Sequence, residues 1–164
     1  MAGICVPLPE ADPLVEPWRR EHDWTHRGGL PAHVTVRMPF PSDIPLGPET
    51  LAGVVDAFLP IEVVLRRLEN RAEALVILVE PDAGLRSLTH AIGDACRALP
   101  PHRGGQGFAY HITTLRTAAP ALINTAAKAI ERELPRVAVG RELWRFDWVE
   151  TELSVTWKAT RVAR

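Results

Sequence analysis

The sequence has few cysteines, no excess of positive charge and no long apolar run. Cys5 and Cys96 are its only cysteines, too few for a disulfide scaffold and without the spacing of a metal-binding motif, so we expect two small buried residues. A formal net charge of −1 argues against binding to long duplex nucleic acid. No window approaches the roughly 18 apolar residues of a membrane span, and no basic region followed by an apolar run opens the chain. We therefore expect a cytoplasmic monomer with no membrane partner.

The composition is otherwise that of an ordinary globular protein. A chain of 164 residues with 46% hydrophobic content can fill the core of one domain. Fifteen prolines are spread along it and are not gathered in a linker, so we expect them to punctuate helices and strands.

Two short runs rich in β-branched residues each hold a histidine and a threonine two positions apart. Residues 32–40 read Ala-His-Val-Thr-Val-Arg-Met-Pro-Phe, and residues 110–116 read Tyr-His-Ile-Thr-Thr-Leu-Arg. Side chains at positions i and i+2 of a strand leave the same face, so each run presents one imidazole beside one hydroxyl. Because chance alone gives about 0.4 His-x-Thr triplets at this composition, two in similar surroundings indicate a shared purpose.

The surroundings of the two triplets repeat as well. Each motif strand is followed by a helical pattern, then by Leu-Pro (Leu59-Pro60 and Leu134-Pro135), then by a hairpin pattern. This order indicates an internal duplication, with repeats at about residues 31–81 and 109–160 inside one bilobal domain, 1–164. We expect each half to form a small sheet with helices on one face, so that the motif strands face one another across a cleft.

Hydrophobic periodicity and proline positions place the other elements. The pattern predicts a first strand over 4–8, helices over 12–25, 49–59, 82–99 and 121–134, and hairpins over 61–68 with 74–79 and over 137–146 with 149–159. Residues 102–107 are expected to be a loop at the edge of the site.

The two triplets resemble the paired His-x-Thr motifs of the 2H phosphoesterases, the superfamily of 2′-5′ RNA ligases and cyclic nucleotide phosphodiesterases. Residues 111–116 resemble the second motif of the family closely, and residues 31–40 resemble the first. The resemblance implies an α+β, bilobal, duplicated fold, in which two mainly antiparallel sheets face a central cleft with helices outside, about a pseudo-twofold axis. It also implies the catalytic residues His33 and His111 and the phosphate-binding residues Thr35 and Thr113.

These four residues suit attack on a phosphodiester. An unperturbed imidazole has a pKa of about 6.5, so near neutral pH one histidine can accept a proton while the other donates one. The threonine hydroxyls can bind the non-bridging phosphate oxygens. We expect a hydrolase that needs no metal or cofactor and acts on a small nucleotide or RNA terminus; which histidine is the base stays open.

Further residues near the motifs are candidates for substrate binding. Arg37 and Arg116 can pair with phosphate, although an exposed position or a structural ion pair explains each at least as well. Phe40 and Tyr110 can stack on a base, but core packing is the default explanation for both. Arg116 lies five residues from His111, on the opposite face if the strand is regular. His22 and His26 stand four apart, a metal-ligand spacing, but no third ligand is recognisable and we expect no metal there.

Two other classes of function stay open. A non-catalytic module can use the same cleft to bind a nucleotide or RNA end, with the imidazoles acting only as hydrogen-bond donors. A scaffold that binds protein is compatible with the absence of a basic surface, and it predicts no affinity for phosphate.

Overall fold

The computed structural model describes the chain except residues 24–25, 27–28, 72–73, 101–107, 151–154 and 164. The expected loop over 102–107 lies outside the described residues. The elements in chain order are β1 Ala2–Pro7, a 3-10 turn Pro9–Ala11, α1 Asp12–His22, β2 His33–Phe40, α2 Pro48–Phe58, β3 Ile61–Arg71, β4 Ala74–Glu80, α3 Ala83–Ala95, β5 His111–Arg116, α4 Pro120–Glu131, β6 Arg136–Gly140, β7 Leu143–Glu150 and β8 Val155–Ala163.

Prolines mark the starts of three helices, as the sequence predicted. Pro13, Pro48 and Pro120 lie in the first two positions of α1, α2 and α4. The fixed φ of proline suits the first helical turn, and its missing N–H is not needed there because those amides have no partner within the helix.

The strands form two four-stranded antiparallel sheets, in the orders β2-β1-β7-β8 and β5-β4-β3-β6. The α+β architecture with two antiparallel sheets is therefore confirmed. The expectation that each half forms its own sheet is wrong. Motif strand β2 lies in one sheet, and the hairpin β3–β4 that follows it lies in the other. Likewise, motif strand β5 lies in the sheet of β3 and β4, whereas the later hairpin β7–β8 lies in the sheet of β2. The last hairpin also starts later than predicted, because β6 pairs with β3 instead of β7.

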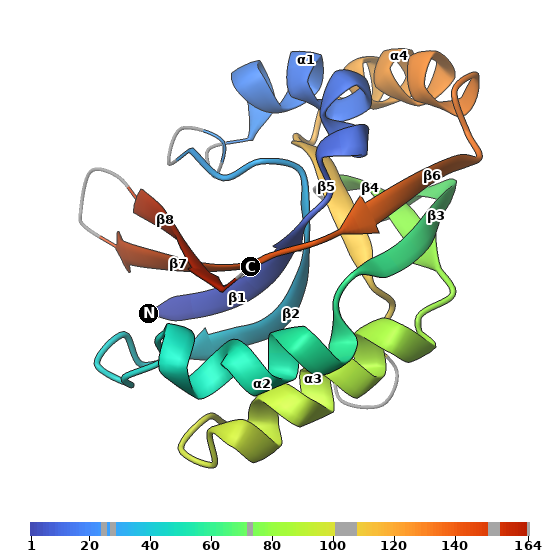
Figure 1. Ribbon diagram of the computed structural model, residues 1–164. Coiled ribbons are helices and arrows are strands. Elements are labelled where there is room, and N and C mark those ends of the chain that lie inside the picture. The colour runs from blue at the N-terminus through green and yellow to red at the C-terminus, as the bar shows by residue number, and fades with distance from the viewer. Residues whose placement is uncertain (24–25, 27–28, 72–73, 101–107, 151–154, 164) are drawn as a thin grey trace.

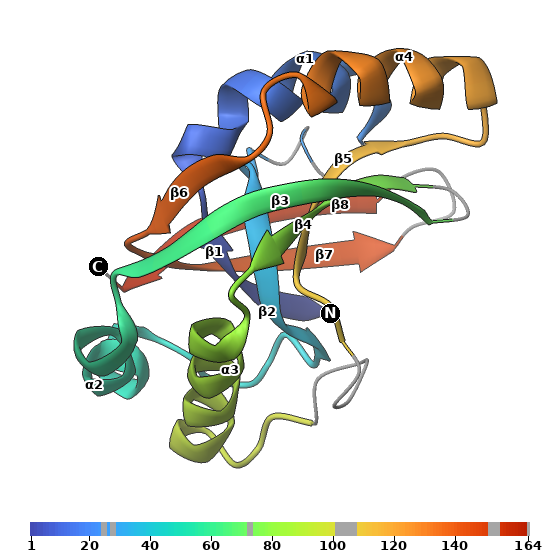
Figure 2. The same ribbon diagram turned by 90° about the vertical axis from the view of Figure 1, so that its right-hand side faces the viewer.

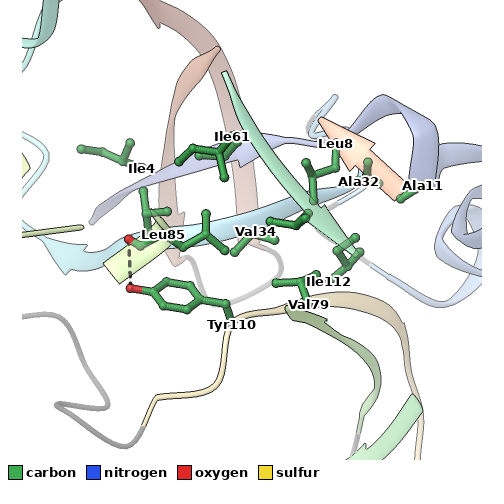
Figure 3. Packing of buried hydrophobic residues seen from close by; sticks show 14 of the residues in the cluster. Ile4, Leu8, Ala11, Ala32, Val34, Ile61, Val79, Leu85, Tyr110 and Ile112 are labelled. Carbon is green, nitrogen blue, oxygen red and sulfur yellow. Dashed lines mark hydrogen bonds between the residues drawn. The ribbon is translucent and has the colours of Figure 1, made fainter. Parts of the chain in front are cut away.

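The helices cover the sheets in two pairs. Figure 1 shows α1 beside α4 on one side of the molecule and α2 beside α3 on the other, and the turned view of Figure 2 agrees. One large apolar cluster joins both sheets to all four helices, and Figure 3 shows part of it, including Val34 and Ile112 from the two motif strands. These motif residues hold β2 and β5 in the core from one face, which leaves the opposite face of each strand for the site.

Candidate active site

His33 and Thr35 lie on one face of β2, which is the edge strand of its sheet. Both side chains are half-buried, whereas Val34 and Val36 between and after them are fully buried. The Nδ1 atom of His33 lies 2.7 Å from the carbonyl oxygen of Pro31, two residues earlier. This contact orients the ring, and a proton on Nδ1 leaves Nε2 as the free nitrogen.

His111 and Thr113 repeat this arrangement on β5, the edge strand of the other sheet. Both are half-buried, and Ile112 between them is buried. The Nδ1 atom of His111 lies 2.9 Å from the carbonyl oxygen of Ala109, again two residues earlier. The strands β2 and β5 are in contact, and the charges of the two histidines interact. The structure thus brings the two predicted motifs together in matched local geometry.

A β-bulge follows the threonine in each motif strand. Thr113 lies opposite Val76 and Leu115 opposite Leu75, so Thr114 is an extra residue in β5. The extra residue reverses the alternation of faces, and Arg116 therefore shares the face of His111. The sequence argument had placed Arg116 on the opposite face by assuming a regular strand, and the bulge corrects it.

A β-bulge in β2 likewise turns Arg37 away from the site. Thr35 lies opposite Cys5 and Arg37 opposite Ile4, so Val36 is the extra residue. Arg37 is 9% exposed, shares its face with the core residue Ile4 and donates to the carbonyl oxygen of Leu99 at 3.2 Å. The expectation that Arg37 contacts substrate is corrected by this placement.

The two aromatic candidates also belong to the core. Phe40 is fully buried beneath the guanidinium of Arg145, which lies 5.7 Å from its ring centre. Tyr110 is 4% exposed, and its hydroxyl lies 2.7 Å from the hydroxyl of Thr89 on α3. Neither ring can stack on a base from these positions, so packing is the explanation that holds for both.

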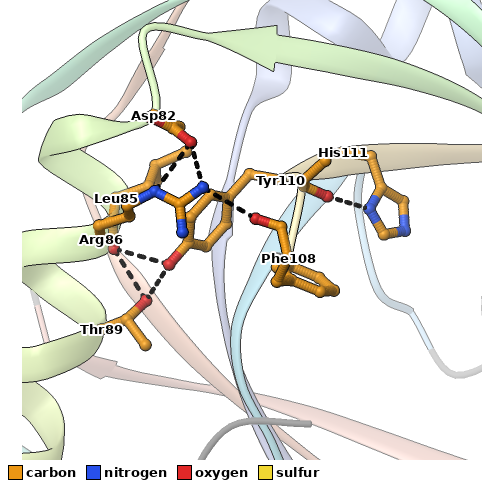
Figure 4. A network of polar contacts seen from close by, with 8 residues as sticks. Asp82, Leu85, Arg86, Thr89, Phe108, Tyr110 and His111 are labelled. Atoms are coloured by element: carbon orange, nitrogen blue, oxygen red, sulfur yellow. Dashed lines mark hydrogen bonds and ion pairs between the residues drawn. The ribbon is translucent and has the colours of Figure 1, made fainter. Parts of the chain in front are cut away.

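An arginine on the preceding helix holds the turn before each motif, a feature that the sequence analysis missed. Arg19 of α1 donates from Nη2 to the carbonyl oxygen of Leu30, three residues before His33, at 2.9 Å. Arg86 of α3 donates from Nη2 to the carbonyl oxygen of Phe108, three residues before His111, at 3.1 Å (Figure 4). Each guanidinium also pairs with an aspartate four residues away, at the end of its own helix: Arg19 with Asp23 just after α1, and Arg86 with Asp82 just before α3. Different spacing to the motifs, 14 residues against 25, hides this repeat in the sequence.

Buried charges lie next to His33. Arg19 and Asp23 are 1% and 2% exposed, form an ion pair at 3.1 Å, and Arg116 of β5 approaches Asp23 at 3.7 Å. Burial of the His33 ring and the positive charge of Arg19 lower the pKa of His33 to about 4, against the opposing effects of the Pro31 carbonyl and Asp23. His33 is therefore neutral near neutral pH and able to accept a proton.

The pKa of His111 is also lowered, primarily by burial. The Ala109 carbonyl opposes this shift, and the guanidinium groups of Arg71 and Arg116 add to it. Arg71, the last residue of β3, has its Nη1 atom 3.1 Å from Nδ1 of His111. Sequence reasoning did not identify Arg71, because only the pairing of β3, β4 and β5 brings it to this histidine.

Aromatic side chains pack beside His33 in a small buried cluster around Phe146. The ring of Phe146 on β7 lies 6.0 Å from the ring of His33 and 5.8 Å from that of Trp148. Gly3 permits this packing, because a Cβ atom there would lie 2.4 Å from the Phe146 ring. A cavity of about 560 Å³ includes in its lining Leu30 and Trp144, which belong to this cluster, and Pro31.

His22 and His26, at which we expected no metal, each have a glutamate near Nε2. Nε2 of His26 lies 3.2 Å from Glu16, and Nε2 of His22 lies 3.6 Å from Glu21. In the described part of the chain, no group of three or more His, Cys, Asp or Glu side chains could hold a metal ion. Within the same residues, no helix is long and apolar enough to cross a membrane.

Comparison with known proteins gives a family match and a fold match. The model of the 2′-5′ RNA ligase superfamily matches residues 7–148, which is most of the chain. A solved phosphoesterase structure is similar over 99% of this chain and 98% of its own, with a TM-score of 0.58 at 15% identity. E. coli LigT in complex with NADP+ is similar over 97% and 94%, with a TM-score of 0.54 at 16% identity. A search of curated protein sequences found no match.

Proposed function

The chain belongs to the 2′-5′ RNA ligase superfamily, and from this premise we propose that it is a metal-independent phosphodiesterase with His33 and His111 as its catalytic residues. Its substrate is a 2′,3′-cyclic phosphate or a related cyclic or 2′-5′ phosphodiester. The observation that carries this proposal is the repeated geometry of the two imidazoles, each with its Nδ1 atom directed at the carbonyl oxygen two residues before it, at 2.7 Å for His33 and 2.9 Å for His111. A histidine that served only packing would not require the same orientation twice.

The reaction divides proton transfer between the two imidazoles. One Nε2 accepts a proton from water as the water oxygen attacks phosphorus, and the P–O bond to the ribose oxygen breaks. The other imidazole donates its Nε2 proton to that leaving oxygen, so that the product is a phosphate monoester with a free hydroxyl. With a hydroxyl of a second nucleotide in place of water as the attacking group, the same two proton transfers form a phosphodiester between two RNA ends as the cyclic P–O bond breaks.

Thr35 and Thr113 hold the phosphate during this transfer. Each hydroxyl lies on the face of its histidine, and within the described residues neither has a protein hydrogen-bond partner. They can therefore donate to non-bridging phosphate oxygens and stabilise the charge that develops there. Arg116 on the same face adds a positive charge near the substrate.

A second candidate function is a non-catalytic module that binds a nucleotide or RNA end. The lowered pKa of each histidine favours it, because two neutral imidazoles near neutral pH supply hydrogen bonds but no general acid. An anionic substrate opposes the lowering of the histidine pKa, because its negative charge stabilises the protonated imidazole.

Turnover of a nucleoside 2′,3′-cyclic phosphate by the purified protein in EDTA distinguishes the two functions. The phosphodiesterase proposal predicts turnover in chelator and its loss in His111→Ala, with His90→Ala as a control because His90 is exposed on α3. Binding of the nucleotide without turnover across a panel of cyclic and 2′-5′ substrates would support the binding module. Activity that disappears in EDTA and returns with a divalent ion would contradict the metal-independent mechanism.

A further inference from the structure

Arg71 lies on the same face of its sheet as His111. Arg71 of β3 lies opposite Ala74 of β4, which in turn lies opposite Arg116 of β5. The guanidinium is held by Glu69, whose Oε1 atom accepts from Nε of Arg71 at 2.6 Å. This ion pair leaves Nη1 directed at Nδ1 of His111, 3.1 Å away.

The Nδ1 atom of His111 consequently has two neighbours of opposite hydrogen-bonding type. The carbonyl oxygen of Ala109 at 2.9 Å accepts, and the guanidinium of Arg71 only donates. With a proton on Nδ1, the ring donates to Ala109; without one, it accepts from Arg71. The two hydrogen bonds therefore exclude one another, and a hydrogen bond from a charged donor is roughly twice as strong as a neutral one.

We propose that Arg71 is a positioning residue that donates to Nδ1 of neutral His111 and so keeps the proton of that imidazole on Nε2, facing the substrate. His33 differs, because its Nδ1 faces the carbonyl of Pro31 at 2.7 Å and holds its own proton. Neutral His33 then presents the lone pair of Nε2, and His111 presents N–H. This inference rests on the proposed function and extends it. His33 is the base, and His111 acts as the acid after a second proton reaches its Nδ1 atom, so that donation of the Nε2 proton leaves a neutral ring.

Protonation of His111 works against Arg71. A second proton places N–H on Nδ1, directed at Ala109, and adds a positive charge beside the guanidinium. The lowered pKa of His111, to which burial and Arg71 contribute, agrees with this geometry. The charged or titratable groups that face or influence this imidazole come from several elements. They are Arg71 and Glu69 from β3, Arg116 from β5, His33 from β2, and Asp23 just after α1, which acts through its contact with Arg116.

An anionic substrate changes the balance. A phosphate near His111 offers the guanidinium a stronger partner than a neutral ring nitrogen and stabilises the imidazolium at the same time. Binding of the substrate therefore releases Arg71 from Nδ1 as His111 acquires the proton that it donates. Arg71 thereby couples arrival of the phosphate to formation of the acid.

The first test requires no turnover. Nitrogen-15 NMR of the full chain identifies which ring nitrogen carries the proton, in wild type, Arg71→Met and the matched control Arg67→Met. Arg67 lies on the same strand and approaches the same Glu69, at 3.8 Å. We expect the Nε2–H tautomer for neutral His111 in wild type and in Arg67→Met, and the Nδ1–H tautomer in Arg71→Met. An Nδ1–H tautomer in wild type would refute the proposal.

Phosphate titration and kinetics give the second test. Inorganic phosphate should raise the pKa of His111 in wild type more than in Arg71→Met. The alkaline limb of kcat/KM should move to higher pH in Arg71→Met, and KM should rise about tenfold.

Arg71→Lys should bring KM back close to the wild-type value, because it retains the positive charge. It should not restore the Nε2–H tautomer of His111, because lysine lacks the fixed fork of donors. A loss of thermal stability with the limb unmoved would mean that Arg71 is only structural. If no variant and no wild type turns over substrate, the proposed function fails while the NMR result still decides the role of Arg71.

Discussion

Burial of a neutral His33 makes the stability of the fold depend on pH in a defined direction. The pKa of His33 is about 4 in the folded protein, against 6.5 for an unperturbed histidine. Between these values the unfolded chain binds more protons than the native one, so stability falls as pH falls from about 6.5 to about 4.

The size of this effect follows from the shift. A difference of one pKa unit corresponds to about 1.4 kcal/mol, so His33 alone costs at most about 2 kcal/mol at pH 5 and about 3 kcal/mol near pH 4, relative to pH 7.5. Half-burial of the ring makes these values upper limits, because water screens part of the interaction. A loss of even 1 kcal/mol is a measurable fraction of the stability of a domain of this size.

Urea denaturation of wild type and His33→Asn at pH 7.5 and pH 5 isolates the contribution. Asparagine keeps an N–H donor for the Pro31 carbonyl but does not titrate. The difference in unfolding free energy between the two proteins should change by about 1 to 2 kcal/mol between the two pH values. His90→Asn is the matched control, since His90 is exposed and lacks the burial that causes the effect. A difference that stays constant with pH would refute the reasoning.

Two other predictions concern the residues around the imidazoles. Thr113→Val should lower kcat/KM by about 10- to 100-fold, which is the loss expected for a hydrogen bond to a charged group, and it should change stability little. Thr114→Val is the control, because it removes a fully buried hydroxyl without a described partner. This variant should keep activity and raise the urea midpoint. Equal effects of the two variants would mean that Thr113 is structural. Arg86→Met, which loses the bond to the Phe108 carbonyl, should lower kcat about tenfold while Tm falls only slightly, because water screens the exposed ion pair of Arg86 with Asp82. Arg97→Met is its control, since Arg97 is an exposed arginine just after α3, and activity unchanged in both would contradict a positioning role for Arg86.

The motif residues and most of the elements could be predicted because local patterns determine them. The alternation of His33, Val34 and Thr35 predicts a strand with one polar face, and the structure has that face. Proline positions gave the helix starts because proline restricts the backbone at its own position. The same order of elements after each motif predicts an internal duplication, and this stays a prediction.

Three features depended on information that the sequence pattern does not hold. Each hairpin could pair with either motif strand and bury a similar apolar face. Hydrophobic periodicity is the same for these pairings, so it does not predict in which sheet a hairpin lies. The bulges at Val36 and Thr114 reverse the faces of Arg37 and Arg116, and no glycine marks either one. Arg19, Arg71 and Arg86 act through contacts with residues distant in sequence, so no local spacing reveals them.

The division of roles between His33 and His111 is the central claim, and the pH dependence of kcat/KM with two leaving groups tests it most directly. Turnover requires neutral His33 and protonated His111, so wild type should give a bell with its acidic limb near pH 4 and its alkaline limb below pH 6.5. His33→Ala should lose the acidic limb and stay slow with any substrate. His111→Ala should lose the alkaline limb and recover selectively with a substrate whose leaving group needs little protonation. If both variants respond alike to pH and to the leaving group, the account of one base and one acid is contradicted, even if each histidine proves essential.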